Sequence, residues 1–337
     1  MAVQKGKRAE KQKTTRKGKT TNALMRHIRT SHHLKVNGST SKKMLLDMGY
    51  FHGYKAYRIT YDNHDRGLSR FEQIEAIHDF DNSLKAILYP IMMKVETALK
   101  NRTIAIIVKD SDPSIDAVFN NSLARYGEKS IGSSEYRKQM TAHLRMKKRV
   151  DGLIAERYST TPMIQHYVHK GETVPIWAIF ELFTMGDFGQ FLNVMSKTKR
   201  TELATEVGVY DPHSDTDATF IARHVFILKD LRNAIAHNSV VFDCRFKSMS
   251  SRNTVTDQLA NKTRIKNINF RTITDYIVLL VYYLKFLKTP KGKITRFIKD
   301  FELVVQKFKK DIDSDRVFNQ ILSTEINSKL SALKDFI

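Results

Sequence analysis

The sequence predicts an all-α protein built as a helical bundle. Only 6 prolines and 14 glycines interrupt its 337 residues, so long uninterrupted elements are expected. Apolar residues recur at steps of three and four positions in several segments, which is the helical period, whereas the alternation typical of strands is scarce. With 41% hydrophobic residues, the chain has ample material for a core.

Residues 1–35 are expected to form a basic, disordered tail ahead of one helical domain spanning residues 36–337. The tail holds eleven basic residues and a single acid, Glu10. Such a segment can order on a phosphate backbone, although a purely solubilising tail would carry the same charge. Near its end lie His27, His32 and His33. No carboxylate or cysteine flanks them, so we interpret them as solvent-exposed side chains and not as metal ligands.

Helices are predicted over residues 41–48 and, beyond an aromatic stretch, over about residues 69–108. Apolar positions of the longer helix lie three or four residues apart, namely Phe80, Leu84, Leu88, Ile91, Val95 and Leu99. Pro90 should kink or split this helix, because proline lacks the N–H of a helical hydrogen bond. The intervening stretch, residues 49–58, interleaves aromatic and basic side chains. It could stack RNA bases, although such residues more often belong to the core.

The remaining helices are predicted from the same period. Residues 135–149 form one, with six basic residues and one acid. Val174-Pro175-Ile176-Trp177 opens another with proline near its first turn, and Gly186 and Gly189 should kink or end it. Further helices are predicted over residues 218–236, 269–287 and 294–309 and within 315–337, with a polar, basic connection over residues 245–266.

The charge balance is the strongest compositional signal. Lys and Arg number 57 against 35 Asp and Glu, a formal net charge of +22. Such an excess repels itself in a folded protein and usually meets a polyanion, with RNA or DNA favoured over an anionic membrane surface. The cations expected to contact RNA are Lys5, Lys7, Arg8, Lys11, Lys13, Arg16, Lys17, Lys19, Arg145, Lys147, Lys148 and Arg149.

The chain is expected to reside in the cytoplasm. Its single cysteine, Cys244, excludes an internal disulfide and favours a reducing compartment. No apolar run reaches the roughly 18 residues of a membrane span, and the first 35 residues lack the apolar core of a signal peptide.

The segment most suggestive of chemistry is residues 230–238, which contains Arg232, Asn233 and His237. A histidine can move a proton off a ribose 2′-hydroxyl or onto a leaving 5′-oxygen near neutral pH. A guanidinium can stabilise the negative charge that accumulates on the phosphate. These two groups suffice for RNA cleavage without a metal or other cofactor, so none is expected.

Spacing alone does not single out this pair, because an Arg followed by a His after four to six residues occurs five times in the chain. On an ideal helix, Asn233 and His237 share a face opposite the apolar stripe, whereas Arg232 lies about 140° away from His237. The Arg232 side chain could reach round the helix, the helix could end near His237, or a symmetric dimer could bring the two residue types together at one composite cleft. We favour the dimer. Alternatively, His237 caps the helix and Arg232 makes an ordinary surface ion pair.

The pattern Arg232-Asn233-x-x-Ala236-His237 resembles the signature of HEPN-superfamily ribonucleases. Other segments resemble, in order, the abortive-infection proteins of the AbiD and AbiF type within that superfamily. They are Gly49-Tyr50-Phe51-His52-Gly53-Tyr54, His78-Asp79-Phe80-Asp81-Asn82-Ser83-Leu84-Lys85, the stretch 96–102, and Val174-Pro175-Ile176-Trp177 with Glu181 and Gly189. Together with the Arg–His motif they span about residues 39–243. The chain departs from the family pattern after its histidine, where Asn238 and an apolar run replace basic and aromatic residues.

This resemblance implies a HEPN-type bundle with additional N- and C-terminal helices, whose motif helix covers about residues 218–238. It also implies a homodimer, metal-independent endoribonuclease activity, and a role in phage defence as a toxin restrained by a structured non-coding RNA. Arg232 would stabilise the phosphate, His237 would be the acid or base, and Asn233 would orient the imidazole or the scissile phosphate. Glu96 and Arg102 would lie near the site, although Glu96 could equally form a surface pair with Lys100.

Two other functions fit the same residues. In the first, the helices form a non-catalytic, dimeric RNA-binding scaffold, so that replacing His237 would change neither binding nor cellular effect. In the second, the basic tail serves a DNA-associated regulator, although no helix-turn-helix signature is evident.

Overall fold

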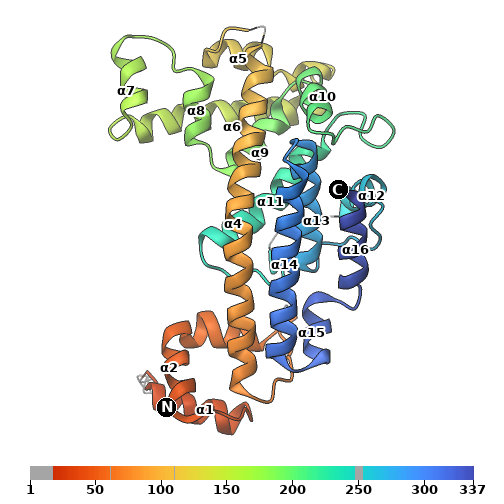
Figure 1. The fold of residues 1–337 in the computed structure, drawn as a ribbon. Helices are drawn as coiled ribbons and strands as arrows, with labels where there is room; N and C mark the ends of the chain where they lie inside the picture. Colours follow the sequence, from red (N-terminus) through yellow and green to blue (C-terminus); the bar gives the residue numbers. More distant parts are fainter. Residues whose placement is uncertain (1–17, 61, 110, 247–252) are drawn as a thin grey trace, which may run out of the picture.

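The computed structural model describes residues 18–60, 62–109, 111–246 and 253–337. These residues form helices and their connections without a β-strand, which confirms the predicted all-α fold (Figure 1). One hydrophobic core extends from Met25 to Leu333. Within the described ranges, no helix is both long and apolar enough to cross a bilayer.

Helix α4 (Phe71–Val108) is the axis of the molecule. Its 38 residues run for about 57 Å, and α14 (Lys291–Ile312) lies alongside it (Figure 1). The predicted split at Pro90 is wrong, because the helix continues through it. Pro90 removes a bond to the carbonyl of Ala86, and since both residues are exposed, water can satisfy that carbonyl.

Helix α13 (Ile273–Phe286) lies at the centre of the C-terminal half. Every residue from 273 to 284 is buried, so this helix is enclosed on all sides. Where a single last helix was predicted, two form, α15 (Asp315–Leu322) and α16 (Ile326–Phe336). They separate at Ser323, whose φ of 67° lies in the left-handed region and ends α15 without glycine or proline.

The N-terminal helices pack against one end of α4 (Figure 1). They are α1 (Thr21–Ser31), α2 (Gly38–Met48), the π-helical segment η1 (Gly49–Lys55) and α3 (Ala56–Arg58). The predicted tail is therefore wrong over α1, where the Thr20 side chain caps the helix and Met25 and Ile28 are buried in the core. Residues 1–17 of the expected tail lie outside the described residues.

Shorter helices cluster at the other end of α4. They are α5 (Ile115–Asn121), η2 (Arg125–Glu128), α6 (Ser134–Arg157), α7 (Pro162–His169), α8 (Ile176–Leu182), α9 (Met185–Val194) and α10 (Lys197–Glu206). Glycine does not end α8, contrary to the prediction. The helix stops before Gly186, and Thr184 then caps α9, which contains both Gly186 and Gly189.

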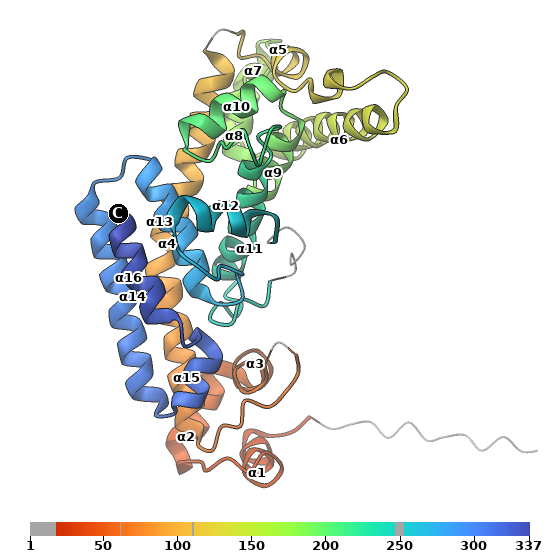
Figure 2. The same ribbon diagram turned by 90° about the vertical axis from the view of Figure 1, so that its right-hand side faces the viewer.

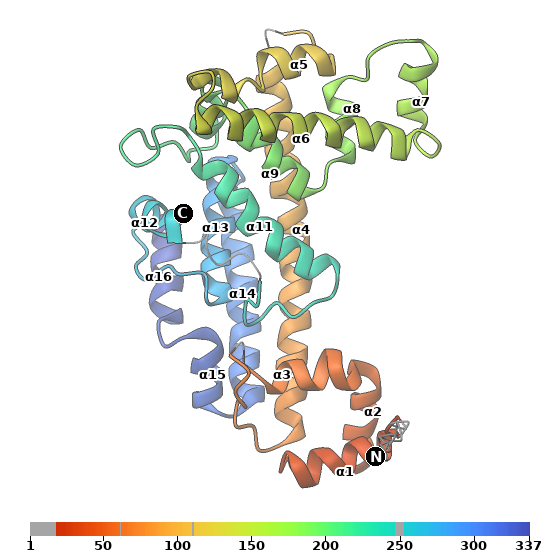
Figure 3. The same cartoon turned by 180° about the vertical axis from the view of Figure 1, so that it is seen from behind.

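Helix α11 (Phe220–Ala236) crosses α4 at mid-length, on the same side of the molecule as α6 (Figures 2 and 3). The predicted core stripe is confirmed, because its members are all buried: Phe220, His224, Ile227, Leu228, Leu231 and Ile235. The connection expected over residues 245–266 contains a helix, α12 (Asn253–Thr263), with Val255 and Leu259 buried.

Candidate active site

Helix α11 ends at the candidate histidine. The C-cap residue is His237, and Asn238 follows with a φ of 50°. The amide of Ser239 donates to the carbonyl of Ala234 at 2.8 Å, and that of Asn238 donates to Ile235 at 3.2 Å. This bond pair is a Schellman motif, in which asparagine tolerates the left-handed position usually taken by glycine. The helix therefore stops at a defined point, and the imidazole lies at its exposed end.

Asn233 and His237 line one open pocket of about 570 Å³. Both side chains are exposed, and the pocket also contains Asp230 from α11 and Ser239 and Arg245 from the following loop. The prediction that Asn233 and His237 share a face is confirmed.

Arg232 lies on a different face of α11, as the helical geometry predicted. Its Nε is 3.4 Å from Oε2 of Glu96 on α4, and it does not line the pocket. Glu96 is buried, and its other oxygen accepts from Lys100 Nζ at 2.9 Å. Glu96 therefore pairs with Arg232 of the motif and with Lys100 of its own helix at the same time. Lys100 also donates to the carbonyl of Phe183 at 2.7 Å, which fixes the carboxylate.

The structure does not bring Arg102 to the motif. Its Nε lies 3.4 Å from a carboxylate oxygen of Glu206 at the end of α10. The helical step from Glu96 to Arg102 turns the two side chains to different neighbours.

Buried Asp81 on α4 fixes the loop after α11. Its Oδ1 accepts hydrogen bonds from the amides of Val241 at 2.7 Å and Phe242 at 2.8 Å. Lys85 Nζ lies 2.7 Å from Oδ2 of Asp81 and donates to Oδ1 of Asn238 at 2.8 Å. A carboxylate bonded in this way is strongly held, because bonds to charged groups are about twice as strong as neutral ones.

A second group of contacts comes from the N-terminal region. His52 Nε2 lies 2.7 Å from the carbonyl oxygen of Asn238. Nearby, Arg66 Nη2 donates to Oδ2 of the partly buried Asp243 at 2.6 Å, and Arg245 donates to the same oxygen. Burial lowers the pKa of Arg66 to about 10 and raises that of Asp243, while the two arginines act in the opposite direction on the carboxyl group. The residues that follow the candidate histidine are thus held by His52, by Asp81 with Lys85, and by the ion pairs of Asp243. The first two contacts come from segments that resemble the abortive-infection proteins.

Asp230 was not predicted as a site residue. It precedes Asn233 by three positions and His237 by seven, so all three share a helix face. Its Oδ1 lies 3.1 Å from Nζ of Lys229, and its Oδ2 is buried without a hydrogen-bond partner among the described residues. The spacing of three and seven residues could have identified Asp230 as a site residue from the sequence.

The cations predicted on α6 differ in their surroundings. Arg145, Lys147 and Lys148 are exposed, whereas Arg149 binds Asp187 through two hydrogen bonds, at 2.9 and 3.2 Å. These bonds raise the pKa of Arg149 and commit its guanidinium to α9. Lys19 is exposed, and the tail cations Lys5, Lys7, Arg8, Lys11, Lys13, Arg16 and Lys17 lie outside the described residues.

The aromatic stretch divides between core and surface. Tyr54 and Tyr57 are buried, while Phe51 is 75% exposed. His32, expected in solvent, is partly buried, and its Nδ1 lies 2.7 Å from the hydroxyl oxygen of Tyr54. His27 packs edge-on against His32, and the described part of the chain contains no cluster of three or more His, Cys, Asp or Glu side chains with the geometry of a metal site.

One comparison with known proteins is positive. The sequence profile of a family described as "Abi-like protein" matches residues 43–243. Among curated proteins and solved structures, no match to the chain was found. The matched range contains α4, α11 and the pocket residues up to Val240, whereas Arg245 and Phe246 of the pocket lie beyond it.

Proposed function

The chain belongs to the Abi-like protein family, and from that premise we propose that it is a metal-independent HEPN endoribonuclease of an abortive-infection, toxin–antitoxin system that acts against phage. We further propose that a structured non-coding RNA binds and restrains it. The observation that carries the proposal is the pairing of exposed Asn233 and His237 at an open pocket, on a helix end held by buried Asp81. The net charge of +22 supports an RNA partner.

The proposed reaction needs only the RNA and the protein. The ribose 2′-oxygen attacks the adjacent phosphorus while the bond to the 5′-oxygen breaks. The 2′-hydroxyl proton passes to a base, and a proton is delivered to the departing 5′-oxygen. His237 performs one of these transfers, and a guanidinium stabilises the charge on the non-bridging oxygens. The products carry a 2′,3′-cyclic phosphate and a 5′-hydroxyl.

A homodimer is part of this proposal. Arg232 and His237 lie on different faces of α11, and Arg232 does not line the pocket that His237 lines. A second copy related by twofold symmetry would supply the missing group from its own α11. The exposed end of α11, on the side shown in Figure 3, supports such a contact.

The test compares wild type with His237→Ala in bacteria and after purification. We expect wild type to arrest growth and to cleave RNA in the presence of a metal chelator, leaving 2′,3′-cyclic phosphate ends. The variant should do neither, while both should purify with the same discrete RNA. His213→Ala is the matched control, because His213 is 95% exposed and lies on the connection between α10 and α11.

The competing function is the non-catalytic RNA scaffold, and one observation favours it. The ion pair of Arg232 with buried Glu96 is what a purely structural arginine would show. If His237→Ala and wild type are equally toxic and bind the same RNA, the nuclease proposal fails and the scaffold stands. If neither binds RNA, both proposals fail.

A further inference from the structure

We propose that the connection between α12 and α13 forms a phosphate-binding site for RNA, with Arg264 and Lys266 as its principal contacts. This inference rests on the proposed RNA partner and names where that RNA is gripped. The site lies beyond residues 43–243, the range that the family profile matches. Its chemistry is that of a phosphodiester or phosphate oxygen meeting a guanidinium and an ammonium group.

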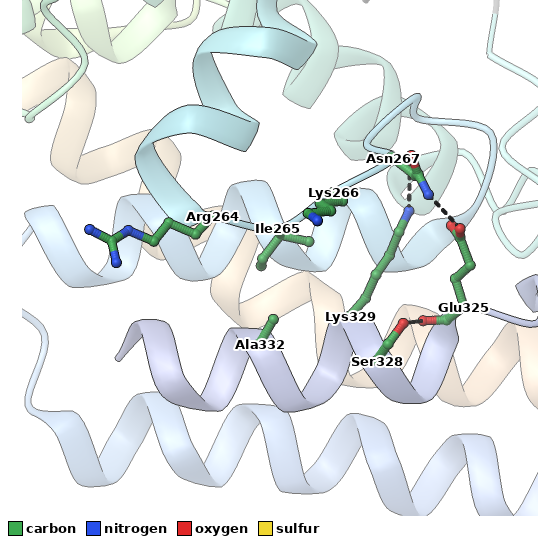
Figure 4. A pocket seen from close by; sticks show the side chains of 8 residues that line it. All are labelled: Arg264, Ile265, Lys266, Asn267, Glu325, Ser328, Lys329 and Ala332. Atoms are coloured by element: carbon green, nitrogen blue, oxygen red, sulfur yellow. Dashed lines mark hydrogen bonds between the residues drawn. The ribbon is translucent and has the colours of Figure 1, made fainter.

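The connection presents its cations outward. Thr263 and Ile265 are buried, while Arg264 and Lys266 are exposed. Within the described residues, neither cation has a hydrogen bond or an ion pair, and Figure 4 shows the Arg264 guanidinium extending away from Glu325. Two unpaired cations next to each other cost electrostatic free energy unless an anion joins them.

Side chains of α16 and α13 hydrogen-bond to the backbone of the connection between α12 and α13. Lys329 on α16 is buried, forms a 2.6 Å ion pair with buried Asp275, and donates to the carbonyl of Asn267 at 2.9 Å (Figure 4). The other oxygen of Asp275 accepts from the amides of Asn269 and Phe270, each at 2.9 Å. A rigid backbone presents Arg264 and Lys266 with little conformational entropy to lose on binding.

Arg264 itself has a φ of 59°, a conformation that costs an arginine free energy and that glycine adopts freely. Arg264 directly follows the last residue of α12, the position at which a left-handed residue commonly ends a helix. A glycine at this position would therefore keep the backbone conformation and remove only the guanidinium.

Arg264 stands between two adjoining pockets. One, of about 290 Å³, contains Lys266 and Lys329, and the other, of about 490 Å³, contains Lys262 and Lys285. The acids here are Glu325, which accepts from the Asn267 amide group, and Asp335. Since Lys329 is paired with Asp275, the two pockets present four other cations, Lys262, Arg264, Lys266 and Lys285, against two acids, which gives phosphate oxygens an attractive surface.

Other cations of the chain differ in their partners. Arg149 binds Asp187, and Arg245 binds Asp243 and the carbonyl of Ala56, so both guanidiniums would have to leave protein partners to reach a phosphate. Arg145 and Lys148 on α6 are exposed and, within the described residues, are as free of such partners as Arg264 and Lys266. What the 264–266 segment adds is its place beside two pockets.

The test is a salt series of RNA binding with the full chain, by fluorescence anisotropy with the RNA that copurifies. Replacing both cations in Arg264→Ala/Lys266→Ala should weaken binding and reduce the slope of log K against log salt by about 2, one for each phosphate that the variant no longer neutralises. Lys299→Ala/Lys310→Ala is the charge-matched control, because both lysines are exposed on α14 and unpaired among the described residues. It should leave the slope unchanged.

Arg264→Gly separates binding from folding, because glycine accepts the left-handed backbone. It should melt at the same temperature as wild type or higher and still lose about one unit of slope. An unchanged slope in both Arg264 variants overturns the site while leaving the proposed ribonuclease intact. If wild type binds no RNA but inorganic phosphate or a nucleotide binds and loses affinity in Arg264→Gly, the phosphate site stands and the proposed RNA function fails.

Discussion

Oδ1 of Asp81 accepts a hydrogen bond from the amide of Val241 at 2.7 Å, across 160 residues of sequence. The carboxylate is fully buried on α4, and the amide belongs to the loop that follows the candidate histidine. The position of His237 therefore depends on a residue in a different helix. That dependence makes Asp81 the first residue to test.

Asp81→Ala should lower the free energy of unfolding by about 3–5 kcal/mol, because two amides lose their acceptor and the partly buried Lys85 ammonium loses its carboxylate partner and keeps only Asn238. Amide hydrogen exchange at Val241 and Phe242 should also accelerate. Asp79→Ala on the same helix is the control, since Asp79 is exposed and its loss should cost within about 0.5 kcal/mol. Unchanged exchange at Val241 would show that Asp81 does not hold the loop.

Arg232→Ala should separate activity from stability. Arg232 is 30% exposed and its contact with Glu96 is 3.4 Å, so its removal should cost under about 1 kcal/mol of unfolding free energy. RNA cleavage should fall by about 100-fold or more, the range for losing a group that stabilises transition-state charge. Denaturant unfolding and cleavage assays on the same preparations measure both. A large loss of stability with cleavage retained would instead assign Arg232 a structural role.

His224 should make the fold sensitive to acid. Burial lowers its pKa from 6.5 to about 3, while its Nδ1 lies 3.0 Å from the hydroxyl oxygen of Tyr283. Between these two pKa values, His224 is therefore protonated in the unfolded chain and neutral in the folded chain. This contribution is small above pH 6.5 and grows as pH falls, reaching a loss of about 2 kcal/mol at pH 5.

The control for that pH dependence is His224→Leu/Tyr283→Phe, which removes both hydrogen-bonding groups together and leaves neither unpaired. Urea unfolding at pH 7 and pH 5 should show a smaller difference for the double variant, by about 2 kcal/mol. Equal differences in the two proteins would mean that His224 accepts a proton while folded.

Gly189→Ala should disturb the contact between α9 and α11. A Cβ at Gly189 would lie 2.9 Å from two ring carbons of Phe226, so the variant should lose about 1–3 kcal/mol of unfolding free energy. Adding Phe226→Leu should recover part of that loss, as a double-mutant cycle would measure. Gly186→Ala in the same helix is the control, because its nearest neighbours are at 3.6 Å and it should be neutral or stabilising. Equal effects of the two alanines would rule out the steric explanation.

Helical periodicity predicted the parts of the site that belong to one element. It placed the core stripe of α11, put Asn233 and His237 on one face and turned Arg232 away from them. These relations depend only on about 100° of rotation per residue, which local sequence determines.

Helical periodicity could not predict contacts between segments that are distant in the sequence. Asp79 and Asp81 lie two residues apart on one helix and therefore about 160° apart around it, which separates the exposed carboxylate from the buried one. The partners of Asp81, the amides of a loop 160 residues later, could not be predicted from that period. Pro90 and Ser323 show the same limit for helix ends. Pro90 is tolerated because the carbonyl it leaves unpaired faces water, and Ser323 ends α15 with a positive φ that its residue type does not predict.

The length of α4 has a consequence for how the chain can be divided. The family profile ends at residue 243, yet α13 and α14, which pack along α4, begin after residue 270. A fragment cut at that boundary would leave the apolar side of a helix about 57 Å long open to water. In this chain the range that the Abi-like profile matches is thus a portion of one folding unit, and the C-terminal helices complete the core around it.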